Sequence, residues 1–228
     1  MSGDELQALK LSLQVAACSV LFGLPLALAI ATLLARGRFP GKALIDALVH
    51  LPLVVPPVVS GYVLLLLLGR HGMMGGWLYD HFGIALAFRW TGAVIAALVM
   101  SFPLMVRPLR LSIETIDHRL EEAARTLGAT RAWVFLSVTL PLALPGMVVG
   151  AVLGFARSLG EFGATITFAG NIPGETRTLS NAIYTLMQMP GGDAAALHLV
   201  VFSIALSMLA LLLSEYCSRR VQARARGL

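Results

Sequence analysis

The sequence predicts an all-α integral membrane protein, and three observations lead to this fold class. The 228 residues are 57% hydrophobic and only 13% charged. The mean hydropathy is +0.82, which is outside the range of ordinary soluble domains. Several apolar runs are long enough to cross a hydrocarbon core of about 30 Å as helices that rise about 1.5 Å per residue. The chain should therefore cross the membrane several times.

We expect a single membrane domain over residues 1–228 with five spanning segments, at residues 11–35, 43–68, 91–113, 138–156 and 194–216. The second segment contains Pro52, Pro56 and Pro57, which must interrupt it because proline lacks a backbone N–H. Freed backbone carbonyls at membrane depth are tolerated only against protein or a water-filled cavity. This segment is therefore a candidate wall of a transport pathway, and a kink used only for packing is the alternative.

Residues 69–90, between the second and third segments, are rich in glycine and aromatic side chains, and we expect an external loop there. His71, Asp80 and His81 lie in this loop, but their spacing fits no metal-ligand pattern, so no metal site is expected. Cys18 and Cys217 lie near opposite ends of the chain in or beside apolar segments, and neither a disulfide nor a metal site is expected from them.

The orientation follows from the positions of the 17 Lys and Arg residues. With the N-terminus outside, the C-terminus inside and five spans, 12 of them fall on the cytoplasmic side and 5 do not. Basic residues concentrate on the cytoplasmic side of membrane proteins. The same asymmetry explains the formal net charge of +5 without a nucleic-acid partner.

Residues 117–137 form the one long amphipathic passage between apolar segments. Asp117 can cap a first helix, Gly128 suits a left-handed C-terminal position, and Thr130 can cap a second helix. The first helix carries an apolar stripe at i, i+3, i+4 and i+7, made of Leu120, Ala123, Ala124 and Leu127. A shallow stripe of small residues on a helix outside the lipid is suited to a groove on another protein.

Residues 155–193 are too polar for a simple span and too hydrophobic for a free loop. Charged residues near membrane depth are usually paired or face an aqueous cavity. Arg157 and Glu161 are four residues apart and would face each other on a helix, either to neutralise each other or as part of a gate. The candidate gate and pathway residues are Arg157, Ser158, Gly160, Glu161, Gly163 and Thr165, because glycines allow close backbone approach and hydroxyls can donate hydrogen bonds.

The amphipathic passage also matches a motif. Glu122-Ala123-Ala124, three residues, Gly128, nine residues, Val138, one residue and Leu140-Pro141 resemble the EAA loop of ABC-importer permeases. The resemblance implies that residues 117–137 are a cytoplasmic coupling loop that docks on an ATP-hydrolysing subunit. It assigns coupling to Glu122, Ala123, Ala124, Leu127, Gly128 and Pro141. The alternative is a plain amphipathic surface helix between two spans.

Further stretches, among them ARSLGEFGATITF, NIPGETRTLSNAIY and HLPLVVPPVVSGYVLLLLLGR, resemble the permease subunits of bacterial molybdate ABC importers. This resemblance implies a type I ABC-importer permease fold in the bacterial plasma membrane, with molybdate and chemically similar tungstate as cargo. It also implies a second copy of the chain, two cytoplasmic ATPase subunits and a periplasmic or surface oxyanion-binding protein. Sulfate and thiosulfate permeases share the EFGA element and are the alternative; a membrane protein outside the ABC class is a remoter one.

The chain carries no GxxxxGK[ST] phosphate-binding loop. ATP must therefore be used by a partner, and we expect this chain to be a transport subunit that is not itself an enzyme and binds no cofactor.

Overall fold

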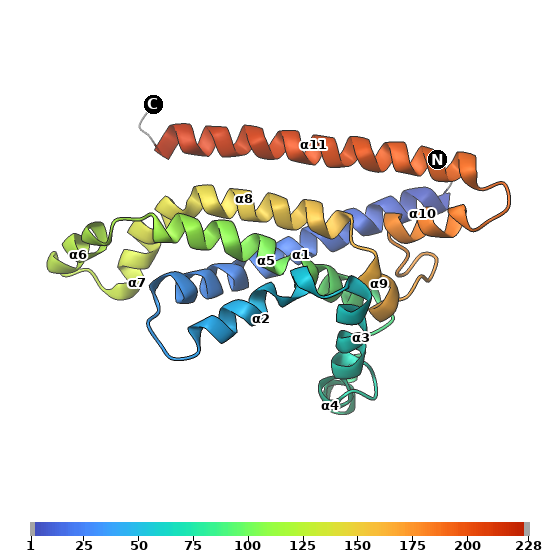
Figure 1. Ribbon diagram of the computed structural model, residues 1–228, viewed down its shortest axis with the longest axis horizontal. Coiled ribbons are helices and arrows are strands. Elements are labelled where there is room, and N and C mark those ends of the chain that lie inside the picture. Colours follow the sequence, from blue (N-terminus) through green and yellow to red (C-terminus); the bar gives the residue numbers. More distant parts are fainter. Residues whose placement is uncertain (1–2, 226–228) are drawn as a thin grey trace.

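Three long helices lie side by side and form the core of the computed structural model, which describes residues 3–225 (Figure 1). They are α1 (Gly3–Arg36), α5 (Trp90–Glu114) and α8 (Leu140–Leu159). Their contact is made by fully buried apolar side chains from all three helices, including Ala27, Ala31, Leu34, Met105, Val106, Leu109, Ile113 and Ala143. Every regular element in the described residues is helical, as the composition predicts.

Glycines at four-residue intervals let α8 lie against the backbone of α5. A Cβ at Gly146 would lie 2.7 Å from the carbonyl oxygen of Pro108, and a Cβ at Gly150 would lie 2.9 Å from that of Met105. Small residues at such spacing allow close backbone approach between membrane helices, where packing rather than the hydrophobic effect holds helices together. The α5–α8 pair is therefore a tightly packed unit.

The second predicted segment is interrupted in the structure, where its prolines predict a break. Helix α2 (Lys42–Val54) and helix α3 (Pro57–Leu68) meet at an angle of 118°. Val55 and Pro56 are extended, with ψ values of 136° and 134°, because the residue before a proline disfavours the α-helical region. Pro52 lies inside α2 and does not end it. The turn sends α3 away from the core bundle (Figure 1).

Residues 69–90 differ from the expected loop because they contain helix α4 (Met73–Phe82). Gly75 lets α4 begin close to the end of α3, since a Cβ there would lie only 2.2 Å from the carbonyl oxygens of Leu68 and Gly69. Gly83, with φ at +67°, ends the helix in the left-handed conformation. The glycines that suggested a loop are thus used for close approach and for a helix stop.

The helix that contains α8 begins well before the span expected at residues 138–156. Helix α7 (Arg131–Val134) continues through a π-helical turn at Phe135–Thr139 into α8, so one helical run extends over residues 131–159. In this turn the Leu140 N–H donates to the Phe135 carbonyl, five residues back. Pro141 follows in the first turn of α8, inside this continuous run, and because it has no N–H it donates no hydrogen bond to the preceding turn.

Short helices and one long helix complete the chain. They are α6 (His118–Thr126), α9 (Gly163–Phe168), α10 (Leu179–Met187) and α11 (Asp193–Ala225). Within the described residues, three helical runs are long and apolar enough to cross a membrane, and a fourth is added if α2 and α3 count as one bent span. Residues 193–209 of α11 form a shorter apolar stretch. The side chains of the basic C-terminal tail used in the charge count lie outside the described part of the chain.

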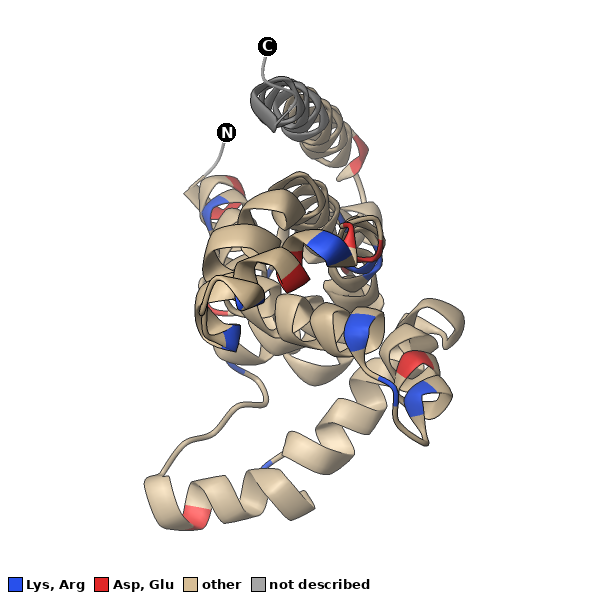
Figure 2. Ribbon diagram, turned by 90° about the vertical axis from the view of Figure 1, so that its left-hand side faces the viewer, with Lys and Arg blue, Asp and Glu red and all other residues tan. Residues whose placement is uncertain are grey.

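The two ends of the bundle differ in what they carry. Helices α6 and α7 lie at one end, beside the end of α1 and the end of α5, whereas α10 and the beginning of α11 lie at the other (Figure 1). Figure 2 views the molecule from the α6–α7 end, where basic and acidic positions are both visible, while the projecting α3 carries neither. The structure thus groups the amphipathic passage with the basic loop at residues 36–42.

Candidate functional site

The amphipathic passage folds as two short helices joined by a tight turn, as its local signals predict. The Asp117 side chain accepts a hydrogen bond from the Arg119 N–H at 2.9 Å and caps α6. Gly128 has a φ of +89°, and the N–H groups of Gly128 and Ala129 donate to the carbonyls of Arg125 and Ala124. This is the Schellman arrangement of a helix C-terminus. The Thr130 side chain accepts from the Trp133 N–H at 3.3 Å and caps α7.

An apolar groove of about 600 Å³ lies between α6 and the start of α7. It is lined by Ala123, Ala124, Leu127, Gly128, Ala129, Thr130, Trp133 and Val138. Leu127 is 89% exposed and Trp133 is 57% exposed. Large apolar side chains around a groove outside the core are typical of a surface that another protein covers.

The six residues expected to couple this chain to a partner do not all lie in the groove. Four of them, Ala123, Ala124, Leu127 and Gly128, line it. Glu122 is exposed on α6 and Pro141 is exposed at the start of α8, and neither is among the lining residues.

One acidic residue of α6 is buried, and it is Glu121 rather than Glu122. The Glu121 Oε1 atom accepts hydrogen bonds from Arg36 Nη2 at 3.0 Å and from Thr139 Oγ1 at 2.9 Å. The sequence pattern does not reveal these contacts, because Arg36 is 85 residues away in the chain. On the helix, Glu121 lies about 110° around the axis from the centre of the apolar stripe, so it faces a different side from the one that suggested a docking face.

The candidate gate segment is built around a buried carboxylate. Glu161 is 1% exposed, and its Oε2 lies 2.6 Å from Nη1 of Arg157. Its Oε1 accepts a hydrogen bond from the Ala164 N–H at 2.8 Å, in the first turn of α9. The expected pair therefore forms, although only Arg157 is on the helix, since α8 ends at Leu159 and Glu161 follows it. The Arg157 side chain is 28% exposed, so one partner of the pair reaches the surface.

The hydroxyl groups of this segment donate within the chain. Ser158 donates to the Ala97 carbonyl at 3.5 Å, and Thr165 donates to the Phe162 carbonyl at 2.9 Å. Both side chains are buried. In this structure these hydroxyls hold the segment against α5 and close its turn.

The two glycines of the segment behave differently from each other. A Cβ at Gly163 would lie 2.8 Å from Cβ of Pro57, so Gly163 permits close approach to the start of α3. A Cβ at Gly160 would have no atom nearer than 3.9 Å, so the close approach expected at Gly160 is absent. Gly61 of α3 makes the reciprocal contact, since a Cβ there would lie 2.7 Å from the Ala164 carbonyl oxygen. The interrupted helix and the buried ion pair are thus parts of one packed unit.

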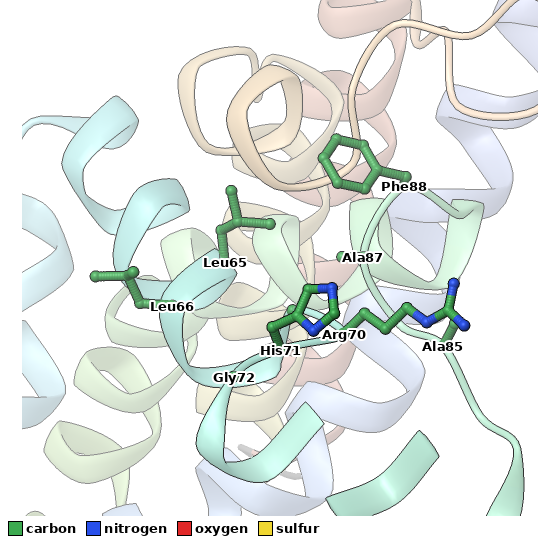
Figure 3. Close-up of a pocket in the computed structure, with 9 residues that line it drawn as sticks. Leu65, Leu66, Arg70, His71, Gly72, Ala85, Ala87 and Phe88 are labelled. Carbon is green, nitrogen blue, oxygen red and sulfur yellow. The ribbon is translucent and has the colours of Figure 1, made fainter. Parts of the chain in front are cut away.

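A second cavity, of about 460 Å³, lies beside the end of α3 and the loop before α5. Figure 3 shows Arg70 and His71 along one side of it, with Phe88 and the leucines of α3 around them. The Arg70 guanidinium lies 4.4 Å from the centre of the Tyr79 ring, which holds α4 against this turn. Phe88 has a φ of +57°, unusual for a bulky residue, and its N–H donates to the Phe168 carbonyl of α9 at 3.2 Å.

The chain is similar to known proteins over nearly its whole length. The model of a family described as the binding-protein-dependent transport system inner membrane component matches residues 23–223. The molybdenum transport system permease protein ModB of Escherichia coli (strain K12) is 60% identical over 225 residues, which cover 99% of this chain and 98% of that protein. The protein of the same name from Haemophilus influenzae is 55% identical and covers 96% of this chain and 95% of its own length.

A solved structure supports the fold. The crystal structure of a bacterial ABC transporter involved in the import of the acidic polysaccharide alginate contains a chain that matches 96% of this one and 80% of its own length. The TM-score is 0.78 at 20% identity, so this likeness concerns the fold alone. The helical architecture, the family match and the identities agree, and the chain therefore belongs to the inner membrane components of binding-protein-dependent transport systems.

Proposed function

We propose that this chain is the permease subunit of an ATP-driven importer that carries molybdate, with tungstate as a chemically similar passenger, into the cytoplasm. The observation that supports this cargo best is the 60% identity to the E. coli molybdenum permease across 99% of the chain. The residues of the candidate gate do not select an oxyanion by themselves, because one arginine per subunit can pair with many anions.

The proposed assembly contains two copies of this chain, two cytoplasmic ATPase subunits and a periplasmic or surface oxyanion-binding protein. The groove between α6 and α7 supports docking of the ATPase, because the exposed Leu127 and Trp133 give it apolar anchors. Glu122 is exposed and directly precedes Ala123 in the chain, and we assign its charge to the same partner. In this proposal the ATPase binds and hydrolyses ATP, and this chain holds no cofactor.

The proposed orientation puts the N-terminus outside and the C-terminus in the cytoplasm of a bacterial inner membrane. It rests on the excess of basic residues on one side of the predicted spans and on the grouping of residues 36–42 with α6 and α7 at one end of the bundle. The docking groove then faces the compartment that contains ATP.

The proposed gate is the unit formed by the end of α8, α9 and the start of α3. Arg157 is the group we assign to the pathway, because it is partly exposed while Glu161 is buried behind it. Glu161, Gly163 and Thr165 hold the unit together in this assignment, through the cap of α9, the contact with Pro57 and the turn at Phe162. Closure of the ATPase dimer would move α6 and switch the paired permeases between inward-open and outward-open states.

The experiment that tests this proposal is ATP hydrolysis and cargo uptake by the complex in proteoliposomes, with its cognate binding protein. We expect molybdate and tungstate to stimulate both, and sulfate to have little effect. Equal or greater stimulation by sulfate would favour the sulfate alternative as the cargo, while the proposed architecture would stand. A chain that purifies with no ATPase subunit would contradict the importer proposal.

A further inference from the structure

A buried polar junction joins α6 to two other helices at the end of the bundle that carries the groove. Arg36 is the last residue of α1, Glu121 lies on α6, and Thr139 is the last residue of the π-helical turn before α8. Glu121 Oε1 accepts a hydrogen bond from each of the other two, at 3.0 Å from Arg36 and 2.9 Å from Thr139. One carboxylate oxygen therefore connects three helices.

The junction is shielded from solvent. The side chain of Glu121 is 10% exposed and that of Arg36 is 17% exposed. The second guanidinium nitrogen of Arg36, Nη1, lies 2.6 Å from Nε2 of His118, and Nη2 also donates to the Ile116 carbonyl at 3.3 Å. Arginine has only donors, so the facing ring nitrogen of His118 must accept. Arg36 thus contacts α6 at two positions, at its first residue, His118, and at Glu121.

Burial makes the loss of one partner costlier here than in an ordinary surface ion pair. Exposed pairs contribute little because water and salt screen them, whereas an ion pair with one partner removed leaves a buried charge without compensation. Glu122, the next residue along α6, is exposed and makes no contact of this kind in the structure.

We propose that Glu121 is a positioning residue that transmits motion of α6 to both α1 and α8. This inference rests on the proposed function, in which an ATPase moves α6. The groove and Glu121 lie on different faces of one short helix, so a force applied at the groove reaches the core through the Glu121 contacts. Helix α8 then connects the junction to Arg157 at its other end. Glu122 contacts the partner in this arrangement, and Glu121 carries the motion inward.

The first test measures molybdate uptake per ATP hydrolysed by the reconstituted complex. We expect the Glu121→Ala variant to co-purify with the ATPase and hydrolyse ATP, while uptake per ATP falls about fivefold or more, as for a lost coupling between two sites. In Glu121→Gln, uptake per ATP should fall less, because the amide oxygen can still accept both hydrogen bonds. The reversed pair Arg36→Glu with Glu121→Arg should recover part of the ratio. Glu114→Gln is the matched control. Glu114 is the last residue of α5 and also pairs with an arginine, Arg110, but its side chain is 38% exposed.

A wild-type uptake ratio in Glu121→Ala would overturn the proposal. If Glu121→Ala fails to accumulate in the membrane, the same ratio of uptake to ATP hydrolysis is measured for Glu121→Gln and Thr139→Val. Wild-type ratios in both of these variants would overturn the proposal.

The second test does not depend on the cargo. Spin labels placed at residues 38 and 125, in a chain without its two cysteines, report the distance between the loop after α1 and α6. We expect this distance to stay constant between the nucleotide-free and ATP-bound complexes with Glu121 present, and to change in Glu121→Ala. A distance that changes equally in both would show that the junction does not hold α6 to α1. Absence of molybdate uptake by the unaltered complex would contradict the proposed cargo alone and leave this distance measurement valid.

Discussion

Glu161 Oε2 lies 2.6 Å from Nη1 of Arg157 across the end of a helix: Arg157 is in the last turn of α8, and Glu161 follows the helix and caps α9. The pair therefore fixes the direction in which the chain leaves α8. Because Glu161 is 1% exposed, its charge is compensated mainly by this arginine and by the Ala164 N–H.

Replacement of Arg157 by alanine should impair transport more than it lowers the yield of folded protein. The change leaves a buried carboxylate without its cation, but Arg157 is partly exposed, so we expect a stability loss below the roughly 3–5 kcal/mol typical of a fully buried pair. Uptake and membrane yield are measured together, with Arg157→Lys as the control that keeps the charge. Normal uptake by Arg157→Ala would show that Arg157 and Glu161 only neutralise each other and that Arg157 has no role in the gate.

Gly163→Ala should destabilise the α3–α9 contact, whereas Gly160→Ala should be tolerated. An added Cβ at Gly163 would lie 2.8 Å from Cβ of Pro57, which is too close. At Gly160 the nearest atom, the Ala156 carbonyl oxygen, would be 3.9 Å away. Overpacking of this kind costs about 1–3 kcal/mol. Thermal unfolding of the two purified variants, beside their uptake rates, checks the difference. Equal stability of both variants would show that α3 and α9 can separate without cost.

Within this chain, substitution at Gly128 should act through backbone conformation and not through a steric clash. A leucine there would also add bulk at the groove that Gly128 lines. The φ of +89° is strained for any residue with a Cβ, at about 1–2 kcal/mol, although a Cβ would meet no atom within 4 Å. Gly128→Leu should therefore weaken the turn between α6 and α7 and uncouple ATP hydrolysis from uptake. Gly128→Asn should retain more coupling, because asparagine tolerates the left-handed region. The ratio of uptake to ATP hydrolysis is the measurement, and equal ratios for Leu and Asn would contradict the conformational explanation.

Glu122→Ala should uncouple ATP hydrolysis from uptake while stability stays within about 0.5 kcal/mol of the unaltered chain, since Glu122 is exposed. Thermal stability and the uptake ratio are measured on the same preparation, with Asp80→Asn on the distant helix α4 as a surface control. If Glu122→Ala and Gly128→Leu both transport normally, the docking assignment of α6 is wrong.

Local signals in the sequence predicted the parts of the site that depend on neighbouring residues. The caps by Asp117 and Thr130 and the left-handed Gly128 are confirmed, because each depends on a few adjacent backbone groups. The break between α2 and α3 is also confirmed, since adjacent prolines exclude a continuous helix there. The predicted pair of Arg157 and Glu161 forms, although Glu161 lies beyond the end of α8.

Contacts between distant residues were not predictable from the pattern. Nothing along the chain connects Arg36 with Glu121, and the expected coupling acid was Glu122, which the family motif contains. The approach of Gly61 to Ala164 depends on the bend of 118°, whose size no residue count reveals. Helix α4 was missed because its glycines are also typical of loops. Ser158 and Thr165 were expected as free donors, but burial commits both to carbonyls of the chain.

The π-helical turn at Phe135–Thr139 has a consequence for the spacing between the groove and the ion pair. Such a turn is equivalent to a one-residue insertion in an α-helix, so the side chains before and after it are offset by about 100° around the axis. Deletion of one residue within it would restore a regular helix, and Arg157 would then face a different neighbour while α7 kept its place. The rotational register of α8 is therefore set at its cytoplasmic-facing start in the proposed orientation, next to Thr139 and the Glu121 junction, and the direction in which Arg157 points depends on a single inserted residue about five turns away.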